Sequence, residues 1–277
     1  MNDAQLLAVA KFRALHESGC FVLPNPWDVG TAIYLEHLGF KALATTSAGF
    51  AFSRGKPDGG VSLDEMLRHI GQITAATTLP VNADFLNGFA DEPEAVATNT
   101  NLCIAQGVAG LSIEDNTGNS AAPLYEEKLA VERIRAARNA IDAAGIPVVL
   151  TGRCETWLVG SASPLRVALE RLTSYAEAGA DCLYAPGVRE PNEIKQIVKA
   201  VAPKPVNVLV SGFNCELTVS QLTDLGVRRI SVGSGLALAA WGAFLRAAQT
   251  IRKDGAFNLL AQNAASAELN ERFRGKS

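Results

Sequence analysis

The sequence predicts an α/β protein: a (β/α)8 TIM barrel with a C-terminal helical extension. Eight short, nearly continuous apolar runs punctuate the chain, as is typical of parallel strands buried on both faces. Amphipathic stretches of helical period separate these runs. Four helical stretches end in a glycine just before the next apolar run, at Gly39, Gly107, Gly179 and Gly226. Glycine there ends a helix in the left-handed conformation, and eight such repeated units favour a barrel.

The expected strands and helices alternate along the chain. The strands are expected at residues 21–24, 42–45, 80–84, 110–114, 147–151, 182–185, 205–209 and 229–232. Helices are expected at 62–74, 93–106, 126–144, 164–178, 190–201 and 218–225, with a long Ala/Leu-rich helix running to about residue 252. A doubly wound open sheet is the alternative, but it would normally carry a GxGxxG turn after its first strand. Asn25-Pro26-Trp27-Asp28 does not match that turn.

The length suits one domain. The chain has 277 residues, and α/β barrels routinely run to about 250 residues. We expect a single domain over residues 1–277, with the barrel over about 20–252 and a helical tail over 253–277. No linker or low-complexity segment interrupts it.

Composition excludes several classes of protein. Lys and Arg number 25 against 28 Asp and Glu, for a net charge of −3, and no basic cluster marks a nucleic-acid binder. No apolar run is long enough to span a membrane. We expect no signal peptide and a cytoplasmic location. The scattered cysteines are expected to be free thiols: Cys20, Cys103, Cys154, Cys182 and Cys215.

Histidine is scarce. The three histidines, His16, His37 and His69, fall in stretches that are expected to be helical, away from strand ends. A histidine-based catalytic triad or a multi-histidine zinc site is therefore not expected. Carboxylates, arginine or a hard metal ion must carry any catalysis.

Polar side chains gather at the carboxyl ends of neighbouring expected strands, where TIM barrels place their active sites. They are Asn82, Asp84, Glu114, Asp115, Arg153 and Glu155, with Thr45, Thr46, Ser47 and Asp58 in the loop after the second strand. Asn82 and Asp84 are two residues apart and therefore point to the same side. Converging carboxylates need a cation, and ligands that are all oxygen select Mg²⁺, with Mn²⁺ as the alternative ion.

Each of these residues also has a structural interpretation. An acidic residue that ends a strand, such as Asp84 or Glu114, commonly caps the next helix. Arg153 alone fits a salt bridge, and Asp58 fits an ordinary turn. Their convergence favours a site. Residues 231–235, rich in Gly and Ser, fit equally well a backbone cradle for phosphate or carboxylate and a tight turn.

At these residues the sequence resembles the isocitrate lyase/phosphoenolpyruvate mutase superfamily, over residues 21–252. The resemblance rests on Thr46-Ser47, a loop containing Asp58, Asn82-Ala83-Asp84 where the family usually has Asp-Ala-Asp, Gly110-Leu111-Ser112-Ile113-Glu114-Asp115, and Arg153. It implies a Mg²⁺ ion bound by Asp84, with Asp58, Glu114 and Asn82 orienting its waters. It also implies a small 2-oxo or 2-hydroxy carboxylate substrate held by Thr46, Ser47 and Arg153. The shared intermediate is an enolate, and Arg153, Asp58 and Glu114 are the candidate catalytic residues.

Two departures from the family pattern narrow the activity. Asn82 replaces an aspartate and removes one negative charge near the metal. Isocitrate and methylisocitrate lyases carry Lys-Lys-Cys-Gly-His in the loop that here spans residues 116–125 and has no Cys, His or Lys. Thr117, Asn119 and Ser120 match the residue types of a mutase-type gating loop, or form a polar lid with no chemical role.

Three functions remain open. The first is Mg-dependent C–C cleavage of an oxaloacetate- or malate-type dicarboxylate. The second is P–C chemistry, as in a phosphonopyruvate hydrolase or phosphoenolpyruvate phosphonomutase, and the third is a non-catalytic metabolite-binding barrel. The resemblance also implies a homo-oligomer, a tetramer or dimer, that exchanges its C-terminal helix. Residues 236–248, with Trp241 and Phe244, would pack between subunits or on their own barrel.

Overall fold

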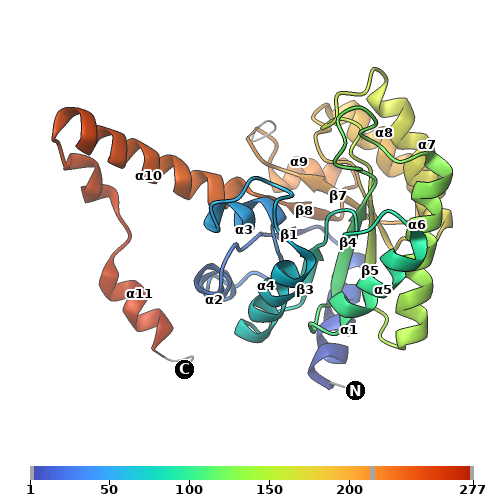
Figure 1. Cartoon of the computed structure of the whole chain (residues 1–277), viewed down its shortest axis with the longest axis horizontal. Helices are drawn as coiled ribbons and strands as arrows, with labels where there is room; N and C mark the ends of the chain where they lie inside the picture. Colours follow the sequence, from blue (N-terminus) through green and yellow to red (C-terminus); the bar gives the residue numbers. More distant parts are fainter. Residues whose placement is uncertain (1–2, 213–215, 275–277) are drawn as a thin grey trace.

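Eight parallel strands form a nearly closed barrel surrounded by helices in this computed structural model, which describes residues 3–212 and 216–274 (Figure 1). The hydrogen-bonded order is β1-β8-β7-β6-β5-β4-β3-β2. The Ala44 N–H, which donates to the Pro24 carbonyl at 3.0 Å, links β2 back to the end of β1. The strands are β1 (Phe21–Leu23), β2 (Leu43–Ala44), β3 (Val81–Asp84), β4 (Gly110–Glu114), β5 (Val149–Arg153), β6 (Cys182–Tyr184), β7 (Val206–Leu209) and β8 (Arg229–Ser231). The predicted (β/α)8 barrel is confirmed.

Helices cover the outside of the barrel and extend beyond it. They are α1 (Asp3–Glu17), α2 (Val29–His37), α3 (Ser47–Ser53), α4 (Leu63–Ala76), α5 (Pro93–Ile104), α6 (Glu127–Ala144), α7 (Pro164–Glu177), α8 (Pro191–Val201), α9 (Val219–Asp224), α10 (Gly235–Asp254), the 3-10 helix η1 (Asn258–Gln262) and α11 (Ser266–Phe273). The predicted glycine stops are confirmed, because Gly39, Gly107, Gly179 and Gly226 have φ of 85°, 84°, 105° and 87°. The three histidines lie in α1, α2 and α4, as predicted.

Helix α1 closes the amino-terminal end of the barrel. The Gln5 side chain donates to the carbonyl of Val108, just before β4, and Arg13 donates to the carbonyl of Pro147, just before β5. The buried ring of Phe12 enters the barrel beside Gly110. A Cβ at Gly110 would lie 2.7 Å from that ring and 3.0 Å from the Val149 carbonyl. Glycine at the first position of β4 therefore leaves the space that the Phe12 ring occupies.

Two expectations about local structure are wrong. The fifth strand was expected at 147–151 but lies at Val149–Arg153, because its pairing with β4 continues to Glu114↔Arg153. Arg153 is therefore the last residue of a strand and held rigidly. The loop expected after the second strand contains α3, which begins after Thr46. The Thr46 hydroxyl accepts from the Gly49 N–H at 3.1 Å and caps this helix.

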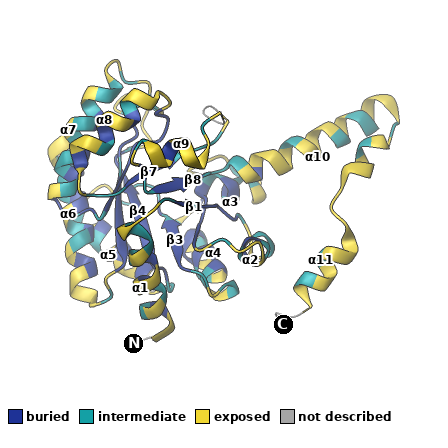
Figure 2. Ribbon diagram, turned by 180° about the vertical axis from the view of Figure 1, so that it is seen from behind, coloured by how far each residue is buried: buried dark blue, intermediate teal, exposed yellow. Residues whose placement is uncertain are grey.

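Helix α10 projects away from the barrel as an arm, from which the chain returns through η1 to α11 (Figures 1 and 2). Ala237 is its one buried residue, whereas Leu238, Trp241, Phe244 and Leu245 are exposed. The alternative in which this stretch packs on its own barrel is therefore wrong for most of its length. Within the described part of the chain, no helix is long and apolar enough to cross a membrane.

Candidate active site

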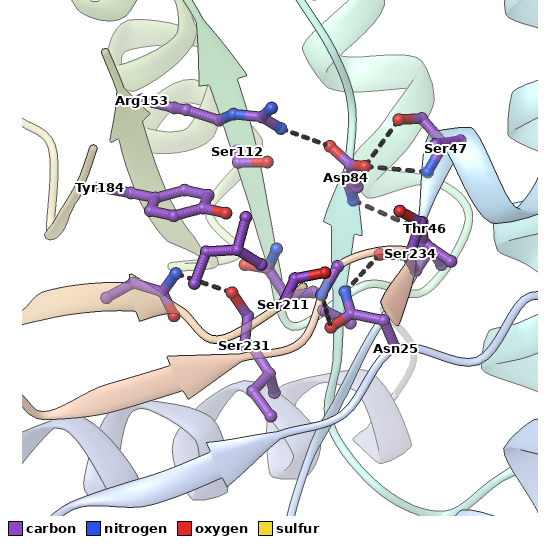
Figure 3. Close-up of a pocket in the computed structure, with 18 of the residues that line it drawn as sticks. Asn25, Thr46, Ser47, Asp84, Ser112, Arg153, Tyr184, Ser211, Ser231 and Ser234 are labelled. Atoms are coloured by element: carbon purple, nitrogen blue, oxygen red, sulfur yellow. Dashed lines mark hydrogen bonds and ion pairs between the residues drawn. The ribbon is translucent and has the colours of Figure 1, made fainter. Parts of the chain in front are cut away.

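A cavity of about 360 Å³ opens at the carboxyl ends of the strands (Figure 3), within the size range of small-molecule sites. Most of the residues predicted for the site line this cavity: Thr46, Ser47, Asp58, Asn82, Asp84 and Arg153. Glu114, Asp115 and Glu155 are the exceptions, because none of them lines the cavity; Glu114 and Glu155 lie against Arg153. Tyr184, Asn207, Arg229 and Asn25 line the cavity as well and were not predicted.

Asp84, the last residue of β3, is the most connected acid of the cavity. Its Oδ2 accepts from the Ser47 N–H at 2.8 Å and the Ser47 hydroxyl at 2.7 Å, and its Oδ1 from Arg153 Nη1 at 3.2 Å (Figure 3). Asp84 therefore does not cap a following helix, as the structural interpretation would require. The first turn of α3 faces this carboxylate.

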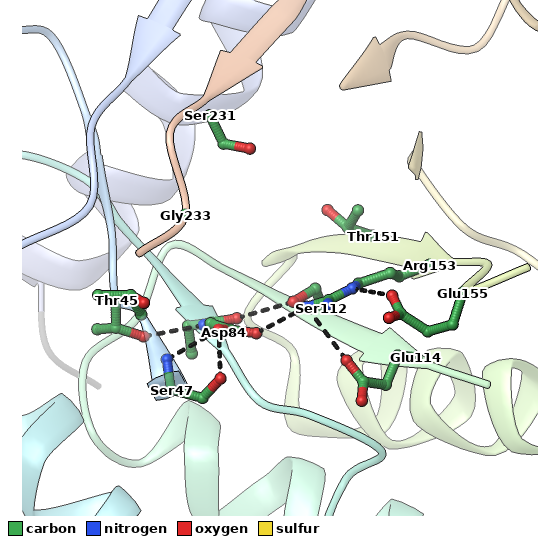
Figure 4. A network of polar contacts seen from close by, with 12 residues as sticks. Thr45, Ser47, Asp84, Ser112, Glu114, Thr151, Arg153, Glu155, Ser231 and Gly233 are labelled. Atoms are coloured by element: carbon green, nitrogen blue, oxygen red, sulfur yellow. Dashed lines mark hydrogen bonds and ion pairs between the residues drawn. The ribbon is translucent and has the colours of Figure 1, made fainter. Parts of the chain in front are cut away.

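Arg153 is surrounded by acids. Its Nη1 lies 3.2 Å from Asp84 Oδ1 and 3.1 Å from Glu114 Oε2, and its Nε donates to Glu155 (Figure 4). Tyr184 covers the guanidinium, with 5.4 Å between the guanidinium carbon and the ring centre. Three carboxylates around one cation leave an excess of negative charge at this wall of the cavity.

This crowding alters the acid–base properties of the cluster. Burial raises the pKa of Glu114 well above its usual value, against the opposing effect of Arg153, and burial raises the pKa of Glu155 in the same way. Partial burial and then the charge of Asp84 raise the pKa of Asp58. Although burial alone would lower it, the surrounding carboxylates raise the pKa of Arg153. Additional positive charge would stabilise this cluster.

The donor set fits a hard cation. Asn82 Oδ1 and Glu114 Oε2 are buried oxygens that accept no hydrogen bond, although Glu114 Oε2 lies at ion-pair distance from Arg153. Asp84 and Asp58 add carboxylate oxygens on the cavity wall. Within residues 3–212 and 216–274, no three acidic, His or Cys side chains form a ready ligand set. The residues present suit Mg²⁺, which binds through one or two carboxylates and keeps several waters.

Asp115 is not part of the acidic cluster around Arg153, so the expectation that it joins the acids at the barrel mouth is wrong. Successive residues along a strand point to opposite sides, and Asp115 turns outward where Glu114 turns inward. Its buried carboxylate accepts from the Glu155 N–H at 2.8 Å, Arg171 Nη1 at 3.0 Å and the Tyr175 hydroxyl at 2.7 Å. Asp115 therefore fixes the chain behind Arg153.

The segment after β8 forms a turn in which the N–H groups of three residues are already used. The N–H groups of Val232 and Gly233 donate to Asn25 Oδ1 at 3.0 and 2.9 Å, and the Gly235 N–H donates to the Val232 carbonyl. The Asn25 amide donates to the Thr45 carbonyl at 2.8 Å. Asn25 thus ties together the ends of β1, β2 and β8, and the turn interpretation of this segment is favoured over the anion cradle.

The loop at residues 116–125 is held by its own hydrogen bonds. The Thr117 hydroxyl donates to the Ala122 carbonyl at 2.6 Å, and the Asn119 side chain accepts from the Ala121 N–H at 3.0 Å. Asn116 and Leu124 form an isolated β-bridge. None of the residues in this loop lines the cavity.

Comparison with known proteins identifies the family. Residues 12–252 match the family model for phosphoenolpyruvate phosphomutase. A solved structure from Burkholderia cenocepacia J2315, described as a lyase or mutase, is 47% identical, covers 98% of each chain and superposes with a TM-score of 0.95. The chain belongs to the phosphoenolpyruvate phosphomutase family, within the isocitrate lyase/phosphoenolpyruvate mutase superfamily.

Two further relatives carry assigned activities. The 2-methylisocitrate lyase of Escherichia coli (strain K12) is 33% identical over 244 residues, which cover 83% of this chain and 76% of that protein. Oxaloacetate acetylhydrolase, solved with its product oxalate, is 25% identical over 96% of this chain and 94% of that one, with a TM-score of 0.85. The relatives of this barrel therefore include enzymes that act on small polycarboxylates.

Proposed function

We propose that the protein is a Mg-dependent lyase that cleaves a C–C bond of a small 2-oxo or 2-hydroxy dicarboxylate, of the oxaloacetate or malate type, through an enolate. The observation that carries the proposal is the over-acidic cluster around Arg153, with Asp84 at the cavity wall. Mn²⁺ is the alternative ion. The similarity to 2-methylisocitrate lyase and oxaloacetate acetylhydrolase supports the substrate class.

Four residues would hold the cation. Asp84 would bind it directly, and Asp58, Glu114 and Asn82 would orient its waters. When bound, Mg²⁺ supplies a Lewis acid that stabilises the developing negative charge on substrate oxygens. The buried oxygens of Asn82 and Glu114 that accept no hydrogen bond support these assignments.

The side chains of the protein position the substrate and balance its charge. Arg153 would donate hydrogen bonds to the substrate carboxylate and stabilise the enolate oxygen electrostatically. Thr46 and Ser47 would contact the same carboxylate from the first turn of α3. Asp58, whose pKa is raised by partial burial and by the charge of Asp84, is a candidate to exchange a proton with the substrate, and Glu114 would hold Arg153 in place.

P–C bond chemistry is the second candidate, because the matching family model is named for a phosphomutase. The loop at 116–125 disfavours an isocitrate lyase mechanism, since it has no Cys, His or Lys. It also keeps Thr117 and Asn119 bonded within the loop and off the cavity wall, which favours C–C over P–C chemistry. A non-catalytic barrel is the third candidate, and Asn82 is the feature that suggests it.

A turnover panel tests the proposal. Purified protein with and without Mg²⁺ would be assayed on oxaloacetate, malate-type acids and phosphonopyruvate. We expect metal-dependent cleavage of a dicarboxylate, which Asp84→Ala abolishes and which Asp142→Asn, on the exposed face of α6, leaves intact. Phosphate release from phosphonopyruvate without turnover of a dicarboxylate would contradict the proposal. Activity unaffected by Asp84→Ala would rule out the metal–enolate mechanism.

The arm and the thiols support proposals about assembly and location. We propose that the chain forms one domain and assembles as a homo-oligomer, a dimer or tetramer, through the exposed apolar side chains of α10. Trp241 and Phe244 would lie in this interface, since exposed contiguous apolar surface marks association sites.

Four cysteines are free, Cys20, Cys103, Cys154 and Cys182, which supports a cytoplasmic location. Cys215 lies outside the described residues.

A further inference from the structure

A second guanidinium lies deeper in the same cavity. Arg229, the first residue of β8, lines the cavity and is 2% exposed. It precedes Ser231, which also lines the cavity, by two residues on one strand, or about 7 Å along the strand. Arg229 therefore lies one layer of side chains below the mouth.

Among the described residues, the hydrogen-bond partners of Arg229 are all neutral. Its Nε donates to Asn207 Oδ1 at 3.0 Å and its Nη2 to the Thr151 hydroxyl at 3.0 Å. Its Nη1 lies 3.3 Å from Nε2 of His16. The Phe12 carbonyl lies 2.7 Å from Nδ1 of His16, so the proton belongs on Nδ1 and Nε2 accepts. Burial, followed by the charge of Arg229, lowers the pKa of His16 to about 3, which keeps this ring neutral.

No carboxylate in the described part of the chain forms an ion pair with this cation. Among the residues that the structure describes, none lies within 4.0 Å as an ion-pair partner of Arg229. Three of its five N–H groups are used by Asn207, Thr151 and His16, and two remain. An isolated buried charge is costly unless a counter-ion balances it.

Two other buried arginines show the contrast. Arg153 has three carboxylates around it. Arg133 has no carboxylate partner either, but it donates to three backbone carbonyls, lies over the ring of Tyr125 and does not line this cavity. Arg229 combines an unbalanced charge with a place on the cavity wall.

We propose that Arg229, held by Asn207 and Thr151, binds the second anionic group of the substrate, the carboxylate remote from the 2-oxo or 2-hydroxy carbon. The inference rests on the proposed function and extends it to the residue that selects dicarboxylates. Arg229 extends from β8 to Thr151 of β5, two residues before Arg153, so its guanidinium lies about one layer of side chains deeper in the barrel than that of Arg153. A substrate that spans the cavity would therefore place one carboxylate at each guanidinium.

Binding of malate and lactate tests this assignment, because lactate has a methyl group where malate has its remote CH₂-carboxylate. Calorimetric titrations in excess Mg²⁺ would compare the wild-type protein with two variants. We expect Arg229→Gln to weaken malate binding by about 10- to 100-fold, the range for a lost charged hydrogen bond, and to leave lactate binding unchanged. Arg228→Gln is the matched control, since Arg228 donates to the Gly19 carbonyl and does not line the cavity.

Asn207→Asp separates binding from structure. It places a carboxylate beside Arg229 with almost no change in shape, so it supplies the missing counter-ion while repelling an anionic ligand. We expect the melting temperature of Asn207→Asp to equal or exceed that of the wild-type protein. We expect its preference for malate over lactate to fall as far as that of Arg229→Gln. It also keeps the assignment testable if Arg229→Gln does not fold.

The outcomes distinguish this inference from the proposed function. If folded Asn207→Asp or Arg229→Gln keeps the wild-type preference for malate, Arg229 does not bind the remote carboxylate, whatever the turnover panel shows. A wild-type protein without any preference for malate over lactate would also overturn the assignment. The proposed function fails separately, when no dicarboxylate is cleaved in the turnover panel.

Discussion

Asp115→Asn removes a buried charge that the cavity does not use. Asp115 is 2% exposed and accepts hydrogen bonds from the Glu155 N–H, Arg171 and the Tyr175 hydroxyl. An asparagine keeps one acceptor for the Glu155 N–H but turns its amide donors toward Arg171 or Tyr175. The variant therefore leaves a buried guanidinium without its carboxylate.

The expected cost follows from that geometry. The Arg171 side chain is 11% exposed, and after the substitution its remaining close acceptor is the Tyr125 carbonyl at 2.7 Å. Removing one partner of a buried ion pair costs about 3–5 kcal/mol. Each kcal/mol lowers the melting temperature of a domain of 150–250 residues by about 2–4 °C, so we expect a loss of roughly 6–20 °C.

Thermal unfolding followed by circular dichroism measures this loss. The matched control is Asp142→Asn, because the Asp142 side chain is 66% exposed and pairs with Arg138 on the helix surface at 2.9 Å. Exposed pairs of this kind contribute at most about 0.5 kcal/mol. If Asp115→Asn melts within about 2 °C of the wild-type protein, or no lower than Asp142→Asn, the structural role assigned to Asp115 is refuted.

Four further predictions follow. Glu114→Gln should raise the melting temperature of the metal-free protein at neutral pH, in calorimetric scans across pH. Because the pKa of Glu114 is raised in the folded state, this carboxyl group destabilises the folded protein once the pH rises above its unfolded pKa of about 4.5. The gain in melting temperature from Glu114→Gln should therefore vanish below that pH. Millimolar Mg²⁺ should raise the melting temperature of the wild-type protein but not of Asp84→Asn, since a cation stabilises only the fold that binds it. Gly110→Ala should lower the free energy of unfolding in urea by about 1–3 kcal/mol, because the methyl group would collide with the Phe12 ring. Phe244→Glu should yield a smaller species by light scattering, and an unchanged mass would remove α10 from the interface.

The fold was predictable because its signals are local and repeated. Apolar runs recur in all eight units and glycine stops in four of them, so an error in one unit does not change the architecture. The ends of the strands were harder to predict where the hydrogen bonds between two strands continue past a residue that interrupts the apolar run. Gly152 ends the apolar run, yet β5 continues through it to Arg153 because β4 offers partners that far.

The candidate site was predictable only in part, and alternation along strands explains which part. Asn82 and Asp84 share a face, and both line the cavity. The same rule separates Glu114 from Asp115, which sequence proximity alone groups together. Arg229 and Ser231 share a face by this rule too, but nothing local indicates that the face is the cavity and not the packed interior.

The two arginines of the cavity give it opposite electrostatic ends. Arg153 is over-neutralised by Asp84, Glu114 and Glu155, so this end attracts a cation before it attracts a carboxylate. Within residues 3–212 and 216–274, Arg229 has neutral hydrogen-bond partners only, so its end attracts an anion directly. A ligand that satisfies both ends must bring a metal ion to the first and a free negative group to the second. A dicarboxylate chelating Mg²⁺ meets both requirements, whereas a monocarboxylate leaves Arg229 unbalanced.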